Sequence, residues 1–390
     1  MNRSRTLTLA GVAAVLLIAG VWLTMHRASE QSELGGGSMF TDLTAALGDV
    51  SEIRLSKGDG SRTTLRKGAG GWTVVEREYP ADSARVRELA LGLANMKIVE
   101  RKTSDPANYA RLGVEGADKP TATGTLVELV AGAKTWSLIV GKNAEGRAIY
   151  VRKPAETASA LVEPTVSADP DPKRWLDRQL TDTAGAGIHE ISVDPASGPS
   201  YLLTRAKRAD TDLTLDPVPK GRKPASSMSL NAQAETLIGF NFDDMRPVPA
   251  SAAPATDRAT FRTFDGQVLE FAGRKEADKA LVTVAASRDA ALAEKFAEPP
   301  AAPAPAAAPA SPAPATPPAT DGAAAPPAAP AAPAKSPDQT TERLAARAKG
   351  LEFEIPLYKY ESLFRPVEDL LEPKPEPPAA AAKKAPAKKK

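Results

Sequence analysis

The chain has 390 residues and an almost balanced charge, with 50 Lys and Arg against 48 Asp and Glu. Five lysines lie in the last eight residues, so the rest of the chain is net negative, which excludes a basic nucleic-acid-binding body. The absence of cysteine and the presence of only two histidines exclude disulfides, thiolate nucleophiles, zinc fingers and iron–sulfur clusters. The length allows two or three domains.

A run of uncharged, mostly apolar residues lies close to the N-terminus, from Leu7 to Leu23. Its 17 residues are just enough to cross a hydrocarbon layer of about 30 Å as a helix. Because Arg3 and Arg5 precede the run, we expect residues 1–6 in the cytoplasm and the body of the chain in the periplasm. The prediction is a single-pass anchor in a bacterial inner membrane, followed by a linker over residues 24–39. A cleaved signal peptide and a buried core helix are the alternatives.

Short apolar stretches separated by glycine-rich turns predict a first α+β domain over residues 40–182. A helix is predicted from Asp82 to Met96, because Asp82 or Ser83 can cap its free N–H groups and apolar residues recur at helical spacing. The predicted strands are Val50–Leu55, Thr63–Arg66, Trp72–Val75, Thr125–Val130, Thr135–Val140 and Ala148–Arg152. We expect a mostly antiparallel sheet that buries one face against the helix.

The same order of elements recurs over residues 186–372 and predicts a tandem duplication, with a second α+β domain. A second helix is predicted from Leu230 to Met245, with Asn231 as its cap. The matching segments are Ile188–Val193 with Val50–Leu55, Leu213–Leu215 with Trp72–Val74, and Val268–Phe271 with the strand after Gly132.

The second domain contains an insert over residues 298–337 that consists almost entirely of alanine and proline. Such a segment cannot build a packed core and is expected to be disordered. The chain resumes with the strand-like Leu351–Ile355, and Pro356–Pro366 repeats the proline and leucine spacing of Pro154–Pro164. We therefore expect a long loop inserted in the second domain. A linker to a third, very small domain is the alternative.

A pattern of turn and packing residues runs through the first predicted domain: Phe40, Gly71-Trp72, Tyr79-Pro80-Ala81-Asp82, Asn108-Tyr109, Leu112-Gly113, Val140-Gly141, Tyr150-Val151-Arg152 and Trp175-Leu176-Asp177. By this pattern, residues 40–372 resemble the bacterial family called domain of unknown function 4340. The resemblance implies a single-span envelope protein that serves as an auxiliary component beside an ABC-type export or gliding-motility transport system. The Ala/Pro insert and the lysine-rich end depart from the family pattern.

The sequence contains neither a G-x-x-x-x-G-K-[ST] phosphate loop nor a G-x-S-x-G elbow, which argues against a P-loop ATPase and a serine hydrolase. Ser197 is expected in a hairpin turn and His189 on a strand surface, instead of acting as nucleophile and base. We therefore predict no catalytic, cofactor-binding or metal-binding residue.

Two carboxylate pairs and three tryptophans are expected to have structural roles, with functional roles as the alternatives. Asp169 and Asp171 each precede a proline, which favours a rigid turn over a calcium site. Asp243 and Asp244 are expected at the solvated end of the second helix, and an acid and base pair is the alternative. The tryptophans expected in the core, with a recognition patch as the alternative, are Trp72, Trp136 and Trp175.

Residues 373–390 form a tail rich in proline, alanine and lysine that is expected to be disordered. A lysine near an anionic surface contributes about 1 kcal/mol to a salt-sensitive tether. Anionic lipid or envelope polymers are therefore the predicted partners of the tail, and a merely solubilising role is the alternative. The candidate polyanion contacts are Lys383, Lys384, Lys388, Lys389 and Lys390.

These features predict a non-enzymatic, membrane-anchored extracytoplasmic protein that needs no cofactor. We expect it to dock its two domains onto an ABC-type transport complex, with the permease as partner. The alternative is an autonomous envelope protein that bridges the membrane to cell-wall or outer-layer polyanions through the insert and the lysines.

Overall fold

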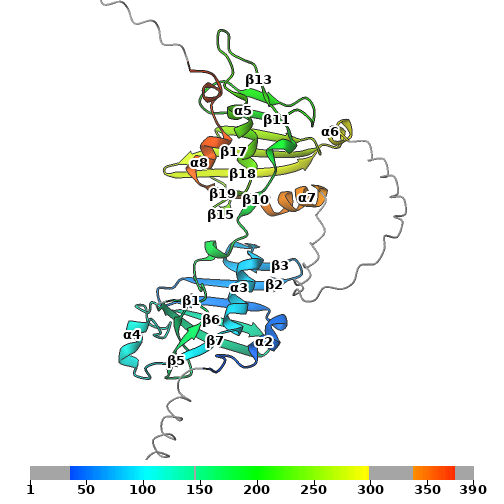
Figure 1. The fold of residues 1–390 in the computed structure, drawn as a ribbon. Coiled ribbons are helices and arrows are strands. Elements are labelled where there is room, and N and C mark those ends of the chain that lie inside the picture. The colour runs from blue at the N-terminus through cyan, green and yellow to red at the C-terminus, as the bar shows by residue number, and fades with distance from the viewer. Residues whose placement is uncertain (1–35, 145, 298–336, 374–390) are drawn as a thin grey trace, which may run out of the picture. The chain divides into compact units, whose positions relative to one another are not determined.

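The computed structural model describes residues 36–144, 146–297 and 337–373 (Figure 1). These residues form two compact units, which meet in the chain between Arg178 and Gln179. Among the described residues, no helix is long and apolar enough to cross a membrane. The predicted anchor from Leu7 to Leu23, the predicted insert except for its last residue, and the lysine tail all lie outside the described residues.

The first unit is built on one sheet. Its strands are β1 (Glu52–Lys57), β2 (Arg62–Gly68), β3 (Gly71–Val74), β4 (Tyr79–Pro80), β5 (Lys97–Arg101), β6 (Thr125–Ala131), β7 (Lys134–Asn143), β8 (Ile149–Arg152) and β9 (Ser159–Glu163). Its helices are α2 (Leu43–Ala46), α3 (Ser83–Ala94) and α4 (Tyr109–Leu112), with the 3-10 helices η1 (Leu47–Asp49), η2 (Val75–Arg77), η3 (Pro106–Asn108) and η4 (Pro172–Trp175). The nine strands pair antiparallel in the order β4-β3-β2-β1-β6-β7-β8-β9-β5.

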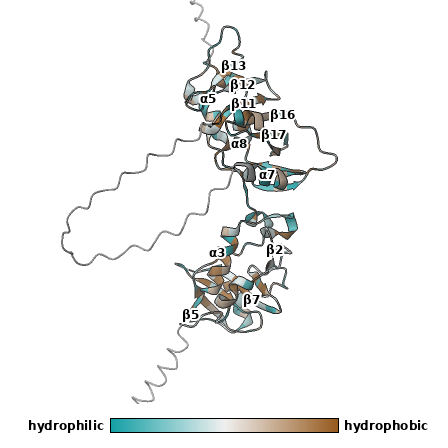
Figure 2. Ribbon diagram, turned by 90° about the vertical axis from the view of Figure 1, so that its right-hand side faces the viewer, coloured by the Kyte–Doolittle hydropathy of each residue, from teal (hydrophilic) through white to brown (hydrophobic). Residues whose placement is uncertain are grey.

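The core of the first unit lies between this sheet and α3 (Figure 2). Side chains alternate across a strand, so every second residue of the central strands is buried while the residues between them are more exposed. Helix α3 contributes a buried stripe at helical spacing. The buried residues at this junction include Ile53 and Leu55 of β1, Val127 and Leu129 of β6, and Val86, Leu89 and Leu93 of α3.

Helix α3 forms at the predicted place. The carboxylate of Asp82 caps it, because Oδ1 accepts hydrogen bonds from the backbone N–H groups of Ala84 at 3.0 Å and Arg85 at 3.2 Å. The helix ends at Ala94, two residues before the predicted end at Met96.

The second unit has an eight-stranded sheet and a separate two-stranded pair. Its strands are β10 (Gln179–Thr181), β11 (Ile188–Asp194), β12 (Tyr201–Thr204), β13 (Thr214–Asp216), β14 (Phe240–Asn241), β15 (Asp244–Pro247), β16 (Asp257–Thr263), β17 (Gln267–Glu276), β18 (Lys279–Arg288) and β19 (Leu351–Ile355). Its helices are α5 (Ser227–Ala234), α6 (Ala290–Lys295), α7 (Pro337–Ala348) and α8 (Leu357–Leu363), with η5 (Gly185–Gly187), η6 (Glu235–Leu237) and η7 (Val367–Leu370). The large sheet has the order β13-β12-β11-β16-β17-β18-β19-β15, and β10 pairs with β14.

The two sheets have corresponding strand orders. Strands β1-β6-β7-β8-β9-β5 follow one another in the first sheet as β11-β16-β17-β18-β19-β15 do in the second. In both sheets the pairing at the centre, β1 with β6 and β11 with β16, is antiparallel. The predicted α+β class, with mostly antiparallel sheets and a few helices, is therefore confirmed.

A short antiparallel bridge closes each unit at the same place, and we call it the clasp. It joins Ala81, just before α3, to Leu176, and it joins Pro224, just before α5, to Leu371. In both units the second partner directly follows a late 3-10 helix, η4 or η7. The hydrogen bonds run from the N–H of Asp82 to the carbonyl of Trp175 at 2.8 Å, Asp177 to Pro80 at 2.9 Å, Ala225 to Leu370 at 2.8 Å and Glu372 to Lys223 at 2.9 Å.

The predicted helix from Leu230 to Met245 is wrong in its extent. Helix α5 begins earlier, because the side chain of Ser226 caps it, and Asn231 lies inside it. The chain leaves the helical region at Gly239, which has a φ of +54° that glycine adopts without strain. The residues that follow form β14 and β15, so their buried aromatic side chains are strand residues and not part of a helical stripe.

The predicted correspondence between Pro154–Pro164 and Pro356–Pro366 is also wrong. Strand β9 ends directly before Pro164, and its counterpart β19 ends directly before Pro356, so these two prolines correspond. The residues after Pro356 form α8, whereas those before Pro164 form β9. The equal spacing of the prolines in the sequence therefore aligned a segment that contains a strand with one that contains a helix.

The chain returns to the same sheet after the Ala/Pro residues. Strand β19 pairs with both β18 and β15, while β18 lies on the other side of the insert in the sequence. In the first unit the loop between the corresponding β8 and β9 covers only residues 153–158. The extra chain of the second unit therefore separates two neighbouring strands, and α7 packs on β18 just before β19 begins.

Candidate functional site

The first unit has a surface cleft of about 460 Å³ beside α3. Its other wall is an extended segment that follows β9 and ends in η4; we call residues 165–175 the strap. The floor is apolar, since Leu89 and Trp175 are buried, while charged and hydroxyl side chains form the rim. The lining residues are Arg85, Glu88, Leu89, Thr165, Val166, Ser167, Asp169, Arg174 and Trp175.

Hydrogen bonds hold the strap in place. The hydroxyl of Thr63 on β2 donates to the carbonyl of Pro170 at 2.7 Å, and the indole N–H of Trp175 donates to the carbonyl of Asp169 at 2.7 Å. The Asp169 carboxylate accepts from the N–H of Asp171, whose own carboxylate caps η4. The predicted turn at this Asp-Pro-Asp-Pro sequence is therefore wrong, because the two carboxylates hold an extended entry to η4. The clasp fixes the end of the strap.

Two guanidinium groups lie on the rim of the cleft. Nη1 of Arg85 donates to the backbone carbonyl of Arg174 at 3.0 Å, which holds the two residues next to each other. Nε of Arg85 lies 3.3 Å from the carboxylate of Asp82, and Nε of Arg174 lies 3.5 Å from that of Asp169. The side chains of Arg85 and Arg174 are 46% and 62% exposed, so both groups are accessible to a ligand.

The second unit fills the corresponding place with a helix. Helix α8 follows β19 as the strap follows β9, and the amide Nε2 of Gln233 on α5 donates to the carbonyl of Leu363 on α8 at 3.1 Å. Both residues are fully buried. An extended chain is narrower than a helix, and the strap therefore leaves space beside α3 that α8 occupies beside α5.

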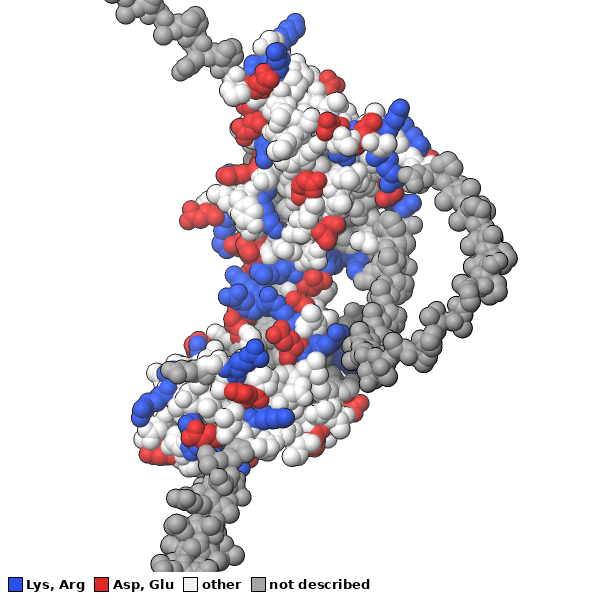
Figure 3. Space-filling model, in the orientation of Figure 1, with Lys and Arg blue, Asp and Glu red and all other residues white. Residues whose placement is uncertain are grey.

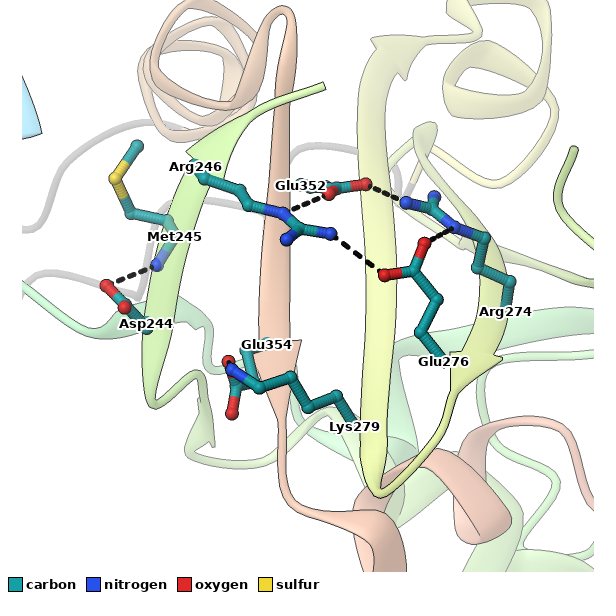
Figure 4. A network of polar contacts seen from close by, with 8 residues as sticks. All are labelled: Asp244, Met245, Arg246, Arg274, Glu276, Lys279, Glu352 and Glu354. Carbon is teal, nitrogen blue, oxygen red and sulfur yellow. Dashed lines mark hydrogen bonds and ion pairs between the residues drawn. The ribbon is translucent and has the colours of Figure 1, made fainter. Parts of the chain in front are cut away.

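The second unit contains a buried network of ion pairs (Figure 4). Glu352 of β19 is fully buried, and its two carboxylate oxygens accept hydrogen bonds from Arg246 of β15 at 2.5 Å and Arg274 of β17 at 2.6 Å. Both arginines also bind Glu276, at 3.1 Å and 3.0 Å. Two positive groups thus balance two negative ones, and the network joins three strands of the sheet.

The electrostatics of this network follow from its hydrogen bonds. The guanidinium groups of Arg274 and Arg246 hold the pKa of the Glu276 carboxyl below its usual value. The hydrogen bonds to Glu352 and Glu276 raise the pKa of the Arg246 guanidinium. Because the four side chains are paired with each other, the arrangement ties the strands together.

Another buried carboxylate anchors α8. The hydroxyl of Tyr360 donates to Oδ2 of Asp257 at 2.6 Å, and Oδ1 of Asp257 accepts from the N–H of Ala196 at 2.8 Å. Burial, together with the hydrogen bond to Asp257, raises the pKa of the Tyr360 hydroxyl. A cavity of about 540 Å³ opens beside this pair, and Ser197 lines it from the exposed loop between β11 and β12.

The structure brings Asp169, Asp171 and Trp175 together in the strap, and the other residues singled out in the sequence lie on separate elements. His189 lies half-buried on β11, where Nδ1 contacts the carbonyl of Arg205 at 2.7 Å and the ring lies between Phe264 and Phe296, so it is more enclosed than predicted. Asp243 and Asp244 lie at the start of β15 and not at a helix end.

The tryptophans differ in how deeply they are buried. Trp136 and Trp175 are buried, as predicted for core residues, whereas Trp72 on β3 is half-buried. The indole N–H of Trp136 donates to Asp42 at 2.9 Å. The lysines from Lys383 to Lys390 lie outside the described residues.

Over the described part of the chain, no group of three or more His, Asp or Glu side chains is arranged to hold a metal ion. Positive and negative side chains are mixed over the visible face of each unit (Figure 3).

The family model described as Domain of unknown function (DUF4340) matches residues 72–260. These residues belong to the DUF4340 family. The predicted family is therefore confirmed over this part of the chain. The DUF4340 match begins in β3 of the first unit and ends in β16 of the second, so it includes α3, the strap and both rim arginines. Comparisons with curated proteins and with solved structures gave no match.

Sequence reasoning missed the cleft within this DUF4340 segment. Arg85 and Arg174 are 89 residues apart, and they meet only because the strap runs alongside α3. Neither residue belongs to a recognisable motif. The Asp-Pro-Asp-Pro sequence was the single local signal, since it marked a restricted backbone at the place where the strap is fixed.

Proposed function

We propose that this protein is a non-enzymatic, membrane-anchored extracytoplasmic subunit that docks onto an ABC-type transport complex. The observation behind the proposal is that carboxylates in both units stabilise the fold. Glu352 ties three strands together, Asp257 anchors α8, and Asp82 caps α3. A rigid fold with an accessible cleft on its surface suits the binding of a partner.

The family resemblance and the N-terminal sequence supply the setting. The DUF4340 match supports a relationship to envelope proteins that accompany transport systems. The apolar run from Leu7 to Leu23, preceded by Arg3 and Arg5, supports an anchor with the body outside the cytoplasm. Corresponding strand orders and clasps support an origin of the two units by tandem duplication.

The test of docking is recovery of the partner. Mild detergent extraction followed by affinity purification through a tag after residue 372 should recover a membrane permease together with its ATPase. A variant that keeps Met1 to Leu23 but lacks the two units should not. Purification that yields the protein without any transporter component would contradict the docking proposal.

The alternative of an envelope-bridging protein rests on a different observation, the lysines from Lys383 to Lys390. In that case the same purification recovers cell-wall or outer-layer fragments, and truncation after residue 382 releases them in a salt-sensitive way. Recovery of a permease that survives this truncation favours docking.

A further inference from the structure

We infer that the strap cleft binds an acidic segment of a protein partner and holds a carboxylate between the guanidinium groups of Arg85 and Arg174. The inference rests on the proposed docking function and names the chemistry of the partner at the docking site. A volume of about 460 Å³ accommodates a few side chains of a peptide.

The geometry leaves hydrogen-bond donors free for such a ligand. The Nε atom of each arginine lies near a carboxylate on the same side of the cleft. Nε of Arg85 is 3.3 Å from Asp82, and Nε of Arg174 is 3.5 Å from Asp169. Nη1 of Arg85 is used by the carbonyl of Arg174. Among the described residues, Nη2 of Arg85 and both Nη groups of Arg174 make no hydrogen bond. A guanidinium fork matches a carboxylate in charge and in shape.

The free donors, and not the net charge, favour an anionic group in the cleft. Asp169 already accepts from the N–H of Asp171 and faces Arg174, and Asp82 caps α3 while it faces Arg85. Glu88 is the one lining carboxylate without an ion pair or hydrogen bond among the described residues. These three carboxylates outnumber the two guanidinium groups, so a carboxylate of the ligand is held by the directed Nη donors.

The second unit favours a peptide over a free ion as the occupant of this place. In the second unit, a segment of this chain, α8, occupies the corresponding place with the apolar side chains of Leu363 and Phe364 buried. The fold thus already accepts an apolar chain segment at this position.

The test uses the full-length protein in detergent and two labelled short peptides. One contains glutamate, leucine and alanine, and the other has lysine in place of glutamate. The acidic peptide should bind and the basic one should not. Arg85→Gln and Arg174→Gln should each weaken binding about tenfold, the loss of one charge-assisted contact. Glu88→Gln should strengthen binding, because it removes the uncommitted like charge.

The matched control is Arg87→Gln, which removes the same charge from an exposed position of α3 that does not line the cleft. Its affinity for the acidic peptide should equal that of the unaltered protein. Thermal melting of each variant verifies that the first unit remains folded.

Three results would overturn the inference: no binding of the acidic peptide, equal weakening by Arg87→Gln, or binding of phosphatidylglycerol vesicles through Arg85 and Arg174 in the absence of peptide binding. The last would assign the cleft to a lipid headgroup. Failure of the docking proposal is distinguishable, because the affinity purification would then lack a permease while the peptide titration remained positive.

Discussion

Glu352 and Arg274 form a buried ion pair across the sheet of the second unit, although they are 78 residues apart in the chain. Nη2 of Arg274 donates to the carboxylate at 2.6 Å. The side chain of Arg274 is 8% exposed and that of Glu352 is 0% exposed. Arg274 lies on β17, before the Ala/Pro residues, and Glu352 lies on β19, after them. The pair therefore helps to keep β19 in the sheet.

We expect Glu352→Gln to destabilise the second unit by about 3 kcal/mol, because it removes the buried counter-charge and leaves two guanidinium groups to share Glu276 alone. Chemical denaturation followed by circular dichroism measures the change. Glu354→Gln is the matched control on the same strand. Glu354 pairs with the exposed Lys279, and such pairs contribute about 1 kcal/mol or less. Equal losses for the two variants would contradict a structural role of the buried network.

The same network predicts a pH dependence. Arg274 and Arg246 lower the pKa of Glu276 in the folded protein from the ordinary value of 4.5. A carboxylate with a lowered folded-state pKa stabilises the fold above its unfolded pKa, and this contribution is lost as the pH falls through the folded pKa. The urea midpoint of Glu276→Gln should therefore lie below that of the unaltered protein at neutral pH and approach it below pH 4.5. A difference that stays constant with pH would rule this out.

Gly273 provides a test of the packing under α8. A Cβ atom at this position would lie 2.4 Å from Cε2 of Phe364 and 2.7 Å from Cε2 of Tyr360, so Gly273→Ala must displace the helix or its rings. We expect a loss of about 1–3 kcal/mol in unfolding free energy. Gly187→Ala in the same unit is the control, because its Cβ would meet no atom within 4 Å. A loss for both variants alike would show that helix displacement is not the cause.

Removal of residues 298–336, with a short glycine and serine connection in their place, should leave the unfolding midpoint of the second unit nearly unchanged. Loop length contributes only about 0.6 kcal/mol per doubling. Removal of Leu351–Ile355 should unfold the second unit, because β15 loses its partner in the sheet and β18 loses one of its two. If the first deletion unfolds the unit as well, the insert is more than a connection.

The sequence predicted those parts of the fold that depend on local signals. The cap at Asp82 located α3, and apolar alternation located the central strands of both sheets. The second helix was misplaced because Leu237, Ile238 and Met245 fit one helical face, while the turn at Gly239 depends on backbone geometry. The cleft depends on the path of the strap alongside α3, which no local pattern around Arg174 encodes.

The clasp at Leu371 has a mechanical consequence for the residues that follow it. Tension applied to the chain after Glu372 acts first on the hydrogen bond from Arg222 to the Glu372 carbonyl and on the two backbone hydrogen bonds to Lys223 and Ala225. These bonds lie at the start of α5, whereas the strand that returns from the insert pairs with β18 and β15. A load on the C-terminal end can therefore open the clasp while β19 keeps both of its neighbours in the sheet.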